Sequence, residues 1–217
     1  AKPTIIGAAS GDYAWVSGGL TGTYNPNEDS WVEGPCFDFT TLDTGSWVAM
    51  KVWWESEFSW DGANLQISLD TAATWTNIGS FGDPNNWYTD NTINANPGGS
   101  QEGWTGSGVS GSGEWVTAKH ALDTALIGEP HVLFRVIFAS DGSVQQEGFA
   151  FDNFAIGVPP TINLGADYVG CANYEITPGL PGTYEWYYED TTGTPTSTLF
   201  STDSTGVFTN TFANDTT

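Results

Sequence analysis

The 217-residue chain has little positive charge, with four Lys and Arg against 26 Asp and Glu, and its formal net charge at pH 7 is −22. This charge makes nucleic acids and anionic membranes poor partners, so we expect neither. Two cysteines are too few for a disulfide framework, and we expect Cys36 to be a buried thiol that is not bonded to Cys171. No apolar run approaches the roughly 18 residues of a membrane-spanning helix.

Glycine and aromatic residues are abundant instead. The chain contains 27 Gly, 11 Pro and 11 Trp, a composition typical of many short strands joined by tight turns. Residues 47–58 carry bulky side chains on both faces, which predicts a central strand of a two-sheet sandwich. Further strands are predicted at 131–138 and 148–156, and the long connection 77–114 is expected at one end of the sandwich. The sequence therefore predicts an all-β antiparallel two-sheet sandwich over residues 1–157, and the resemblance given below implies that it is a jelly roll.

A second domain is expected after a Pro-containing linker at 158–160. Residues 161–217 show short alternating strands, with Cys171 followed by Trp186, which favours a small Ig-like sandwich. The segment is short for such a domain, so we expect it to be truncated. The chain as a whole is interpreted as a piece of a longer extracellular protein.

A turn motif follows the predicted strand around Leu65. The run Ser68-x-Asp70-x-Ala72-x-Thr74-Trp75 resembles the Asp-box hairpin, S-x-D-x-G-x-T-W, with Ala72 where that motif carries Gly. In the Asp-box, the Asp and hydroxyl side chains bind the amides of the turn. The motif is structural and indicates an extracellular β-fold, without identifying a reaction.

The order of several landmarks resembles one family of modules. These landmarks are S-W-V-E-G-P-C-F-D-F, V-W-W-E-S-E-F-S-W-D-G, N-W-Y, G-W-T-G, F-R-V-I-F-A-S-D-G-S and E-G-F-A-F-D-N-F. Together, over residues 28–157, they resemble a jelly-roll module of large secreted surface proteins of gliding Bacteroidota, similar in layout to MAM and reelin-type domains. Residues 161–217 resemble the Ig-like or PKD-like repeats that follow such modules. The resemblance implies an extracellular, cell-surface adhesin exported by the type 9 pathway, although fold analogy alone does not fix a function.

The same resemblance implies a structural calcium ion. In MAM and reelin-like jelly rolls an Asp on the last strand joins upstream acidic residues around the ion, and the matching residue is Asp152. Its alternation with Phe149, Phe151 and Phe154 predicts that it is buried and needs a partner. The alternative is that Asp152 caps backbone amides or pairs with Arg135. The further candidate ligands, all hard oxygen donors from loops, are Glu28, Asp29, Asp61 and Asp141.

Three aromatic residues lie in the Gly-rich connection. Trp87, Tyr88 and Trp104 are candidates for stacking on sugar rings, with at least one indole partly exposed. The alternative is that they cover an end of the sandwich as part of its core.

Catalytic signals are weak. His120 and His131 lie in no H-E-x-x-H motif, and neither a G-x-S-x-G motif nor a phosphate-binding loop is present. Paired carboxylates of a glycoside hydrolase are not excluded by an acidic sequence. We expect a protein that is not an enzyme.

Three short motifs in the second domain resemble the O-glycosylation signal of Bacteroidota, Asp-Ser/Thr followed by a small or apolar residue or Thr. They predict modification at Thr191, Ser204 and Thr216.

The leading functional hypothesis is a non-catalytic extracellular adhesion module of a long surface protein, such as a gliding adhesin or surface filament. Its expected partners are surface polysaccharides or other glycans and the neighbouring domains of the same chain. The alternatives are an accessory carbohydrate-binding domain of a secreted hydrolase and a structural spacer repeat.

Overall fold

The computed structural model describes residues 2–159 and, beyond them, 174–176, 184–189, 195–203 and 208–210. The chain divides into two compact units, residues 1–159 and 160–217, and the expected linker at 158–160 contains this division. Across the described residues, no helix is both long and apolar enough to cross a membrane.

In the second unit, two antiparallel strand pairs are described. Strand β9 (Tyr174–Ile176) pairs with β12 (Phe208–Asn210), and β10 (Tyr184–Glu189) pairs with β11 (Pro195–Asp203). The Ig-like assignment stays a prediction. Four residues singled out from the sequence lie outside the described residues: Cys171, Thr191, Ser204 and Thr216.

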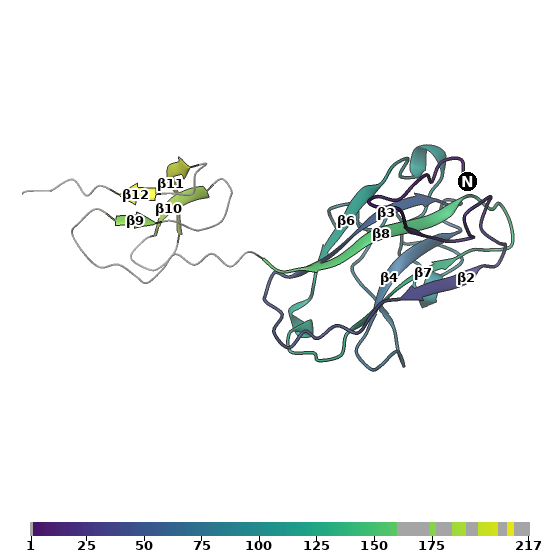
Figure 1. The fold of residues 1–217 in the computed structure, drawn as a ribbon, viewed down its shortest axis with the longest axis horizontal. Helices are drawn as coiled ribbons and strands as arrows, with labels where there is room; N and C mark the ends of the chain where they lie inside the picture. Colours follow the sequence, from purple (N-terminus) through teal and green to yellow (C-terminus); the bar gives the residue numbers. More distant parts are fainter. Residues whose placement is uncertain (1, 160–173, 177–183, 190–194, 204–207, 211–217) are drawn as a thin grey trace, which may run out of the picture. The chain divides into compact units, whose positions relative to one another are not determined.

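The first unit is a sandwich of two four-stranded antiparallel sheets (Figure 1). One sheet has the order β1 (Trp15–Val16), β8 (Gly148–Gly157), β3 (Trp47–Glu55) and β6 (Val116–Ala121). The other has the order β2 (Asp29–Glu33), β7 (Leu133–Ala139), β4 (Gly62–Ser68) and β5 (Thr76–Asn77). Strand β1 therefore pairs with β8, β2 with β7, β3 with β6 and β4 with β5. This is the strand order of a jelly roll, and the predicted fold is confirmed.

Strand β3 lies in the middle of its sheet, between β8 and β6. Its inward side chains, Val48, Met50, Val52 and Trp54, belong to the main core. On the opposite face, Trp53 packs into a smaller cluster with the N-terminal segment. The sequence predicted a central strand here because bulky side chains occur on both faces, and β3 has this arrangement.

Strand β4 is buried on both faces, although its alternation predicted a half-buried strand. Leu65 and Ile67 face the core. The polar face is buried because residues 97–102 cover it: the Asn64 side-chain amide donates to the Pro97 carbonyl (2.9 Å) and that of Gln66 to the Gly98 carbonyl (3.0 Å). These hydrogen bonds compensate part of the cost of burying the polar face, and Asn64 Oδ1 is left without a partner.

The connection 77–114 joins the edges of the two sheets on one side of the sandwich. The Trp104 and Ala63 backbones exchange two hydrogen bonds (2.8 and 3.0 Å) beside β4, and the Asn85 carbonyl accepts from the Lys119 amide of β6 (3.1 Å). The connection also contains two short 3-10 turns, Pro97–Gly99 and Gly108–Ser110, and a third, Thr124–Leu126, follows β6. The connection thus closes the side of the sandwich at which β5 and β6 lie.

The Asp-box turn forms as its sequence predicts. The Asp70 carboxylate accepts from the Thr74 amide (2.9 Å) and hydroxyl (2.6 Å), and the Ser68 hydroxyl accepts from the Ala72 amide (3.0 Å). The hydrogen bonds from the Thr74 hydroxyl and amide, with one from the Ser68 hydroxyl (2.8 Å), lower the pKa of Asp70 to about 2. Ala72 has a φ of 69°, in the left-handed region that favours glycine.

Ala72→Gly should stabilise the protein, because it removes the steric cost of a left-handed alanine, about 1 kcal/mol. For a domain of this size we expect the melting temperature to rise by roughly 2–4 °C, measured by calorimetry. Ala73→Gly is the matched control: its φ is not positive, so it should lower the melting temperature. Equal effects of the two changes would contradict this account of the turn.

Candidate functional site

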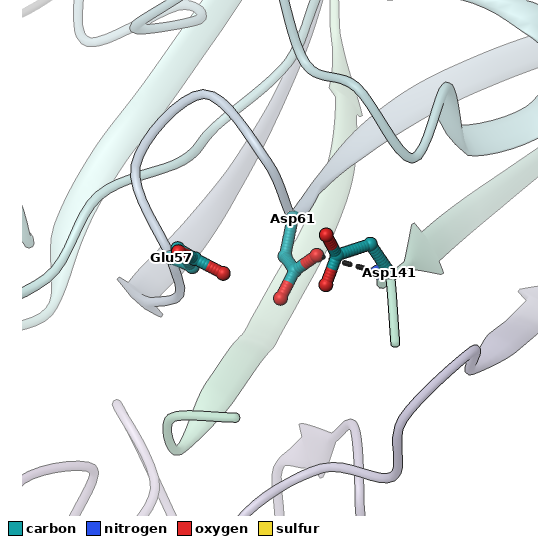
Figure 2. Close-up of side chains that lie close together, drawn as sticks. All are labelled: Glu57, Asp61 and Asp141. Atoms are coloured by element: carbon teal, nitrogen blue, oxygen red, sulfur yellow. Dashed lines mark hydrogen bonds between the residues drawn. The ribbon is translucent and has the colours of Figure 1, made fainter. Parts of the chain in front are cut away.

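Three carboxylates converge where the β3–β4 turn meets the loop after β7 (Figure 2). Glu57 and Asp61 belong to the turn and Asp141 to the loop. One oxygen of each carboxylate lies within 4.8 Å of those of the other two. We call these three residues the acidic cluster. Two of the predicted calcium ligands, Asp61 and Asp141, therefore lie together, and Glu57 was missed by the sequence analysis.

The acidic cluster is held by hydrogen bonds around Asp61, which is fully buried. Its carboxylate accepts from the Tyr24 hydroxyl (2.6 Å) and from the Asp141 amide (2.7 Å). The Tyr24 hydroxyl in turn accepts from the Glu57 amide (3.2 Å). The Glu57 Oε2 atom is buried without a hydrogen-bond partner. The cluster thus offers oxygen atoms and an unsatisfied acceptor.

The electrostatics of the cluster disfavour its negative charge. Burial, followed by the charges of Asp61 and Asp141, raises the pKa of Glu57. Burial is also the main cause that raises the pKa of Asp61, with a smaller contribution from the charge of Asp141. A bound cation or proton would relieve this repulsion. The donor set of hard oxygens suits calcium, and the orphaned Glu57 oxygen is consistent with it.

Asp152 is not part of the acidic cluster, and the expectation that it is buried among phenylalanines is wrong. It is only half-buried and lies opposite Lys51 in the β3–β8 register. Its carboxylate accepts from the amides of Ser10 (3.0 Å) and Asn153 (2.6 Å). The alternative that it caps backbone amides is correct. The alternative that it pairs with Arg135 is not, since Arg135 lies in the other sheet and binds Gln66.

A β-bulge explains the wrong prediction. Asn153 has a φ of 53°, and the β3–β8 register shifts at this point. The extra residue lets Phe151 and Phe154, three apart, both pack against the core. Strict alternation with Phe149 and Phe151 places Asp152 on the outer face, and only Phe154, which lies beyond the bulge, suggested the inner one.

The other two predicted ligands do not reach the cluster either. The Glu28 carboxylate accepts from the amides of Gly18 (3.1 Å) and Asn25 (2.9 Å) and from the Ser30 hydroxyl (2.9 Å). Asp29 is exposed at the start of β2. Both lie at the edge of their sheet.

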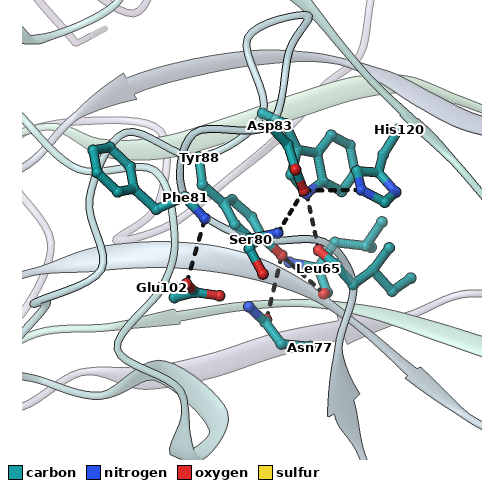
Figure 3. Close-up of polar contacts among 10 residues, drawn as sticks. Leu65, Asn77, Ser80, Phe81, Asp83, Tyr88, Glu102 and His120 are labelled. Carbon is teal, nitrogen blue, oxygen red and sulfur yellow. Dashed lines mark hydrogen bonds and ion pairs between the residues drawn. The ribbon is translucent and has the colours of Figure 1, made fainter.

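The three candidate sugar-binding aromatics are buried, so the prediction that Trp87 or Trp104 is partly exposed is wrong. The exposed fractions of Trp87, Tyr88 and Trp104 are 1%, 4% and 0%. Their polar atoms are used internally: the Trp87 indole donates to the Ile78 carbonyl (2.9 Å), and the Tyr88 hydroxyl donates to the Leu65 carbonyl (3.1 Å; Figure 3). Sugar stacking on these residues loses its basis, and the alternative that they form core is confirmed.

A polar contact between Ser80, Asp83 and His120 holds the start of the connection 77–114 (Figure 3). The Asp83 carboxylate accepts from the Ser80 amide (2.7 Å) and lies 3.0 Å from His120 Nε2. Within the described part of the chain, no other Lys, Arg or His nitrogen lies within 4.0 Å of a carboxylate oxygen. This contact fixes the connection to β6.

On the side of the sandwich opposite β5 and β6, the edges of β1 and β2 leave a groove. It consists of two adjoining hollows of about 300 and 270 Å³. The Trp15 indole is 60% exposed and stacks on Phe151, with ring centroids 6.4 Å apart. The side chains that line the groove are mainly apolar: Val32, Phe134, Val136, Phe149, Phe151 and Phe154. We call this the β1–β2 groove.

The outer face of the β2–β7–β4–β5 sheet carries an aromatic row. The Arg135 guanidinium lies 4.5 Å from the centroid of Trp75 and 5.8 Å from that of Trp31. Trp31 is 52% exposed. The row presents stacked planar groups to solvent.

Cys36 is exposed, so the expectation of a buried thiol is wrong. Its sulfur lies 3.9 Å from His131 Nδ1. Neither residue lines the β1–β2 groove, although Pro35, the neighbour of Cys36, does.

No protein-family model and no curated protein matches this chain. The resemblance to surface modules of Bacteroidota thus stays an expectation, and the function proposed below rests on the geometry of the structure.

The acidic cluster predicts a particular pH dependence when divalent cations are removed by a chelator. Because Glu57 and Asp61 have raised folded pKa values, their contribution to stability is fully present below their unfolded values near 4. It is lost as the pH rises through the folded values. At pH 7, Glu57→Gln should therefore raise the melting temperature, but by less than the roughly 2–4 °C that about 1 kcal/mol would give in a domain of this size, because solvent screens the charge of the partly exposed Glu57.

Glu114→Gln is the control, since Glu114 is exposed and outside the cluster. The stabilisation by Glu57→Gln should shrink as the pH is lowered to 4. A stabilisation that is the same for both variants, or independent of pH, would contradict the raised pKa of Glu57.

Proposed function

We propose that this chain is a non-catalytic extracellular adhesion module of a larger surface protein, and that it binds its partner in the β1–β2 groove. The observation that carries the proposal is the Trp15 indole, which is 60% exposed above an apolar groove. Apolar surface that stays open at the edge of a sandwich is typical of an interaction site. The surrounding acidic surface keeps such a module soluble and repels other acidic molecules.

The absence of catalysis is supported by the position of reactive groups in the described residues. His120 is held by Asp83 beside Trp87. Within the acidic cluster, the Asp61 carboxylate accepts internal hydrogen bonds from Tyr24 and from the Asp141 amide. These contacts favour structural roles for the residues that a hydrolase would use.

The accessory carbohydrate-binding function is the second candidate, and one observation favours it. The Trp31–Arg135–Trp75 row is a planar, partly exposed surface, and a flat apolar face suits the C–H face of a sugar ring. In this case a polysaccharide would bind the outer face of the sheet. The two candidates thus use different tryptophans.

Binding of the 217-residue chain, coupled to beads, to surfaces coated with polysaccharides or proteins distinguishes the candidates. We expect Trp15→Ala to reduce retention at least tenfold, because it removes the exposed wall of the groove. Trp31→Ala should have little effect, and both variants should keep their melting temperature within a few degrees. Loss with Trp31→Ala alone would favour the carbohydrate-binding function, and no retention on any surface would favour a structural spacer.

We also propose that calcium is the structural cofactor and that the acidic cluster holds it. The proposal is supported by the three converging carboxylates, by the orphaned Glu57 oxygen and by raised pKa values of Glu57 and Asp61. A calcium ion would supply the positive charge that this cluster lacks. It would tie the β3–β4 turn to the loop after β7.

Calcium at a hundredfold excess over its Kd stabilises the folded state by about 2.7 kcal/mol, so at pH 7 we expect the melting temperature to rise by roughly 5–10 °C. Glu57→Gln and Asp141→Asn should remove most of this rise. Asp152→Asn is the matched control and should keep it, because Asp152 lies outside the cluster. An unchanged melting temperature, or loss with Asp152→Asn alone, would contradict this site.

A further inference from the structure

Strand β2 has an unpaired edge beside the β1–β2 groove. Among the described strands it is the last of its sheet, and it bonds there only to β7. At the ends of this ladder the Gly34 amide donates to Phe134, and the Glu28 carbonyl accepts from Ser140, each at 2.9 Å. Hydrogen-bonded pairs alternate along an antiparallel ladder. The residues whose backbone groups point away from β7 are therefore Asp29, Trp31 and Glu33.

The facing edge, that of β8, is also largely unpaired. Strand β1 is two residues long and pairs only with Ala150 and Phe151. Beyond this point β8 continues to Gly157, and β3 is its only neighbour among the strands that the structure describes. The groove thus lies between two sheet edges that offer backbone donors and acceptors. This arrangement suits an extended peptide better than a compact ligand.

The inward side of β2 determines what would enter the groove. Ser30 and Val32 face the interior, opposite Phe151 and the exposed Trp15. A strand added beside β2 would lie about 4.8 Å away. Every second side chain of this strand would point into the apolar groove, so these side chains should be apolar.

The outward side of β2 determines the charge of the occupant. Asp29 and Glu33 are exposed, and cross-strand pairs favour opposite charges and disfavour like ones. Side chains placed opposite them should be Lys or Arg. A second copy of β2 would instead bring its own Asp29 and Glu33 to this edge, and two chains of charge −22 repel each other.

We infer that the partner in the β1–β2 groove is an extended segment of another protein, with alternating basic and apolar residues, added as a strand to the free edge of β2. The inference rests on the proposed function, since it names the partner of that same groove. The edge supplies backbone hydrogen bonds, and the groove and its acidic rim select the side chains.

The probe is a capped eight-residue peptide in which valine alternates with lysine, titrated calorimetrically into the 217-residue chain. We expect saturable one-to-one binding. A lysine–serine peptide of equal charge and a valine–glutamate peptide should each bind at least tenfold more weakly. N-methylation of alternate amides of the valine–lysine peptide should also cost at least tenfold, because it removes hydrogen bonds to the edge.

Two variants at one position isolate the contribution of the backbone edge. Trp31→Ala and Trp31→Pro both remove the indole, but only proline removes the N–H that faces the open edge, a position where edge strands accept it. We expect the proline variant to bind the valine–lysine peptide at least tenfold more weakly than the alanine variant. If the proline variant fails to fold, the N-methylated peptide decides the same question.

The results distinguish a failure of the inferred strand addition from a failure of the proposed function. Equal binding of the lysine–serine peptide would show non-specific attraction to an acidic surface and overturn the inference. Binding of an oligosaccharide in the groove that depends on Trp15 would overturn the inferred strand addition but support the proposed function. Adhesion that depends on Trp15, without any peptide binding, would have the same two consequences. Peptide binding without an effect of Trp15→Ala on adhesion would support strand addition and overturn the proposed function.

Discussion

The position of Trp104 is the constraint on which the rest of the sandwich depends. Its backbone pairs with Ala63 beside β4 of one sheet, and its indole stacks on Phe149 of the other, with centroids 5.4 Å apart. Trp87 and Tyr88 pack around it at 5.2 and 4.7 Å. A single buried aromatic cluster thus holds the two sheets together and anchors the connection 77–114, which closes this side of the sandwich.

Closure of one side leaves the main core of the described sandwich open toward solvent on the opposite side, in the β1–β2 groove. On that side β1 is short and β2 ends its sheet, so Phe151 and Phe154 stay only half-buried. The edge is protected from indiscriminate pairing by acidic side chains, a common device of natural edge strands. The same acidic side chains make the edge selective for a basic partner, which links the unusual charge of the chain to its proposed adhesive function.

The fold was largely predictable from the sequence, and the site was not. Alternation and aromatic content identified β3, β7 and β8, because buried strands leave a strong local pattern. Asp152 was misplaced because Phe154, which lies beyond the bulge at Asn153, was taken to share its face. Trp87 and Trp104 were expected near solvent because they lie among glycines, but backbone pairing with β4 draws the connection into the core. Glu57 was missed because its proximity to Asp141 depends on contacts between distant segments.

Amide hydrogen exchange along β2 of the isolated chain tests the central claim, that the β2 edge is open, most directly. If the edge is open, the amides of Trp31 and Glu33 should exchange rapidly, while those of Ser30 and Val32, which bond to β7, should be strongly protected. This alternation between neighbouring residues is the expected result. Protection of Trp31 and Glu33 equal to that of Val32 would show that another part of the chain already covers the edge, and would contradict the account.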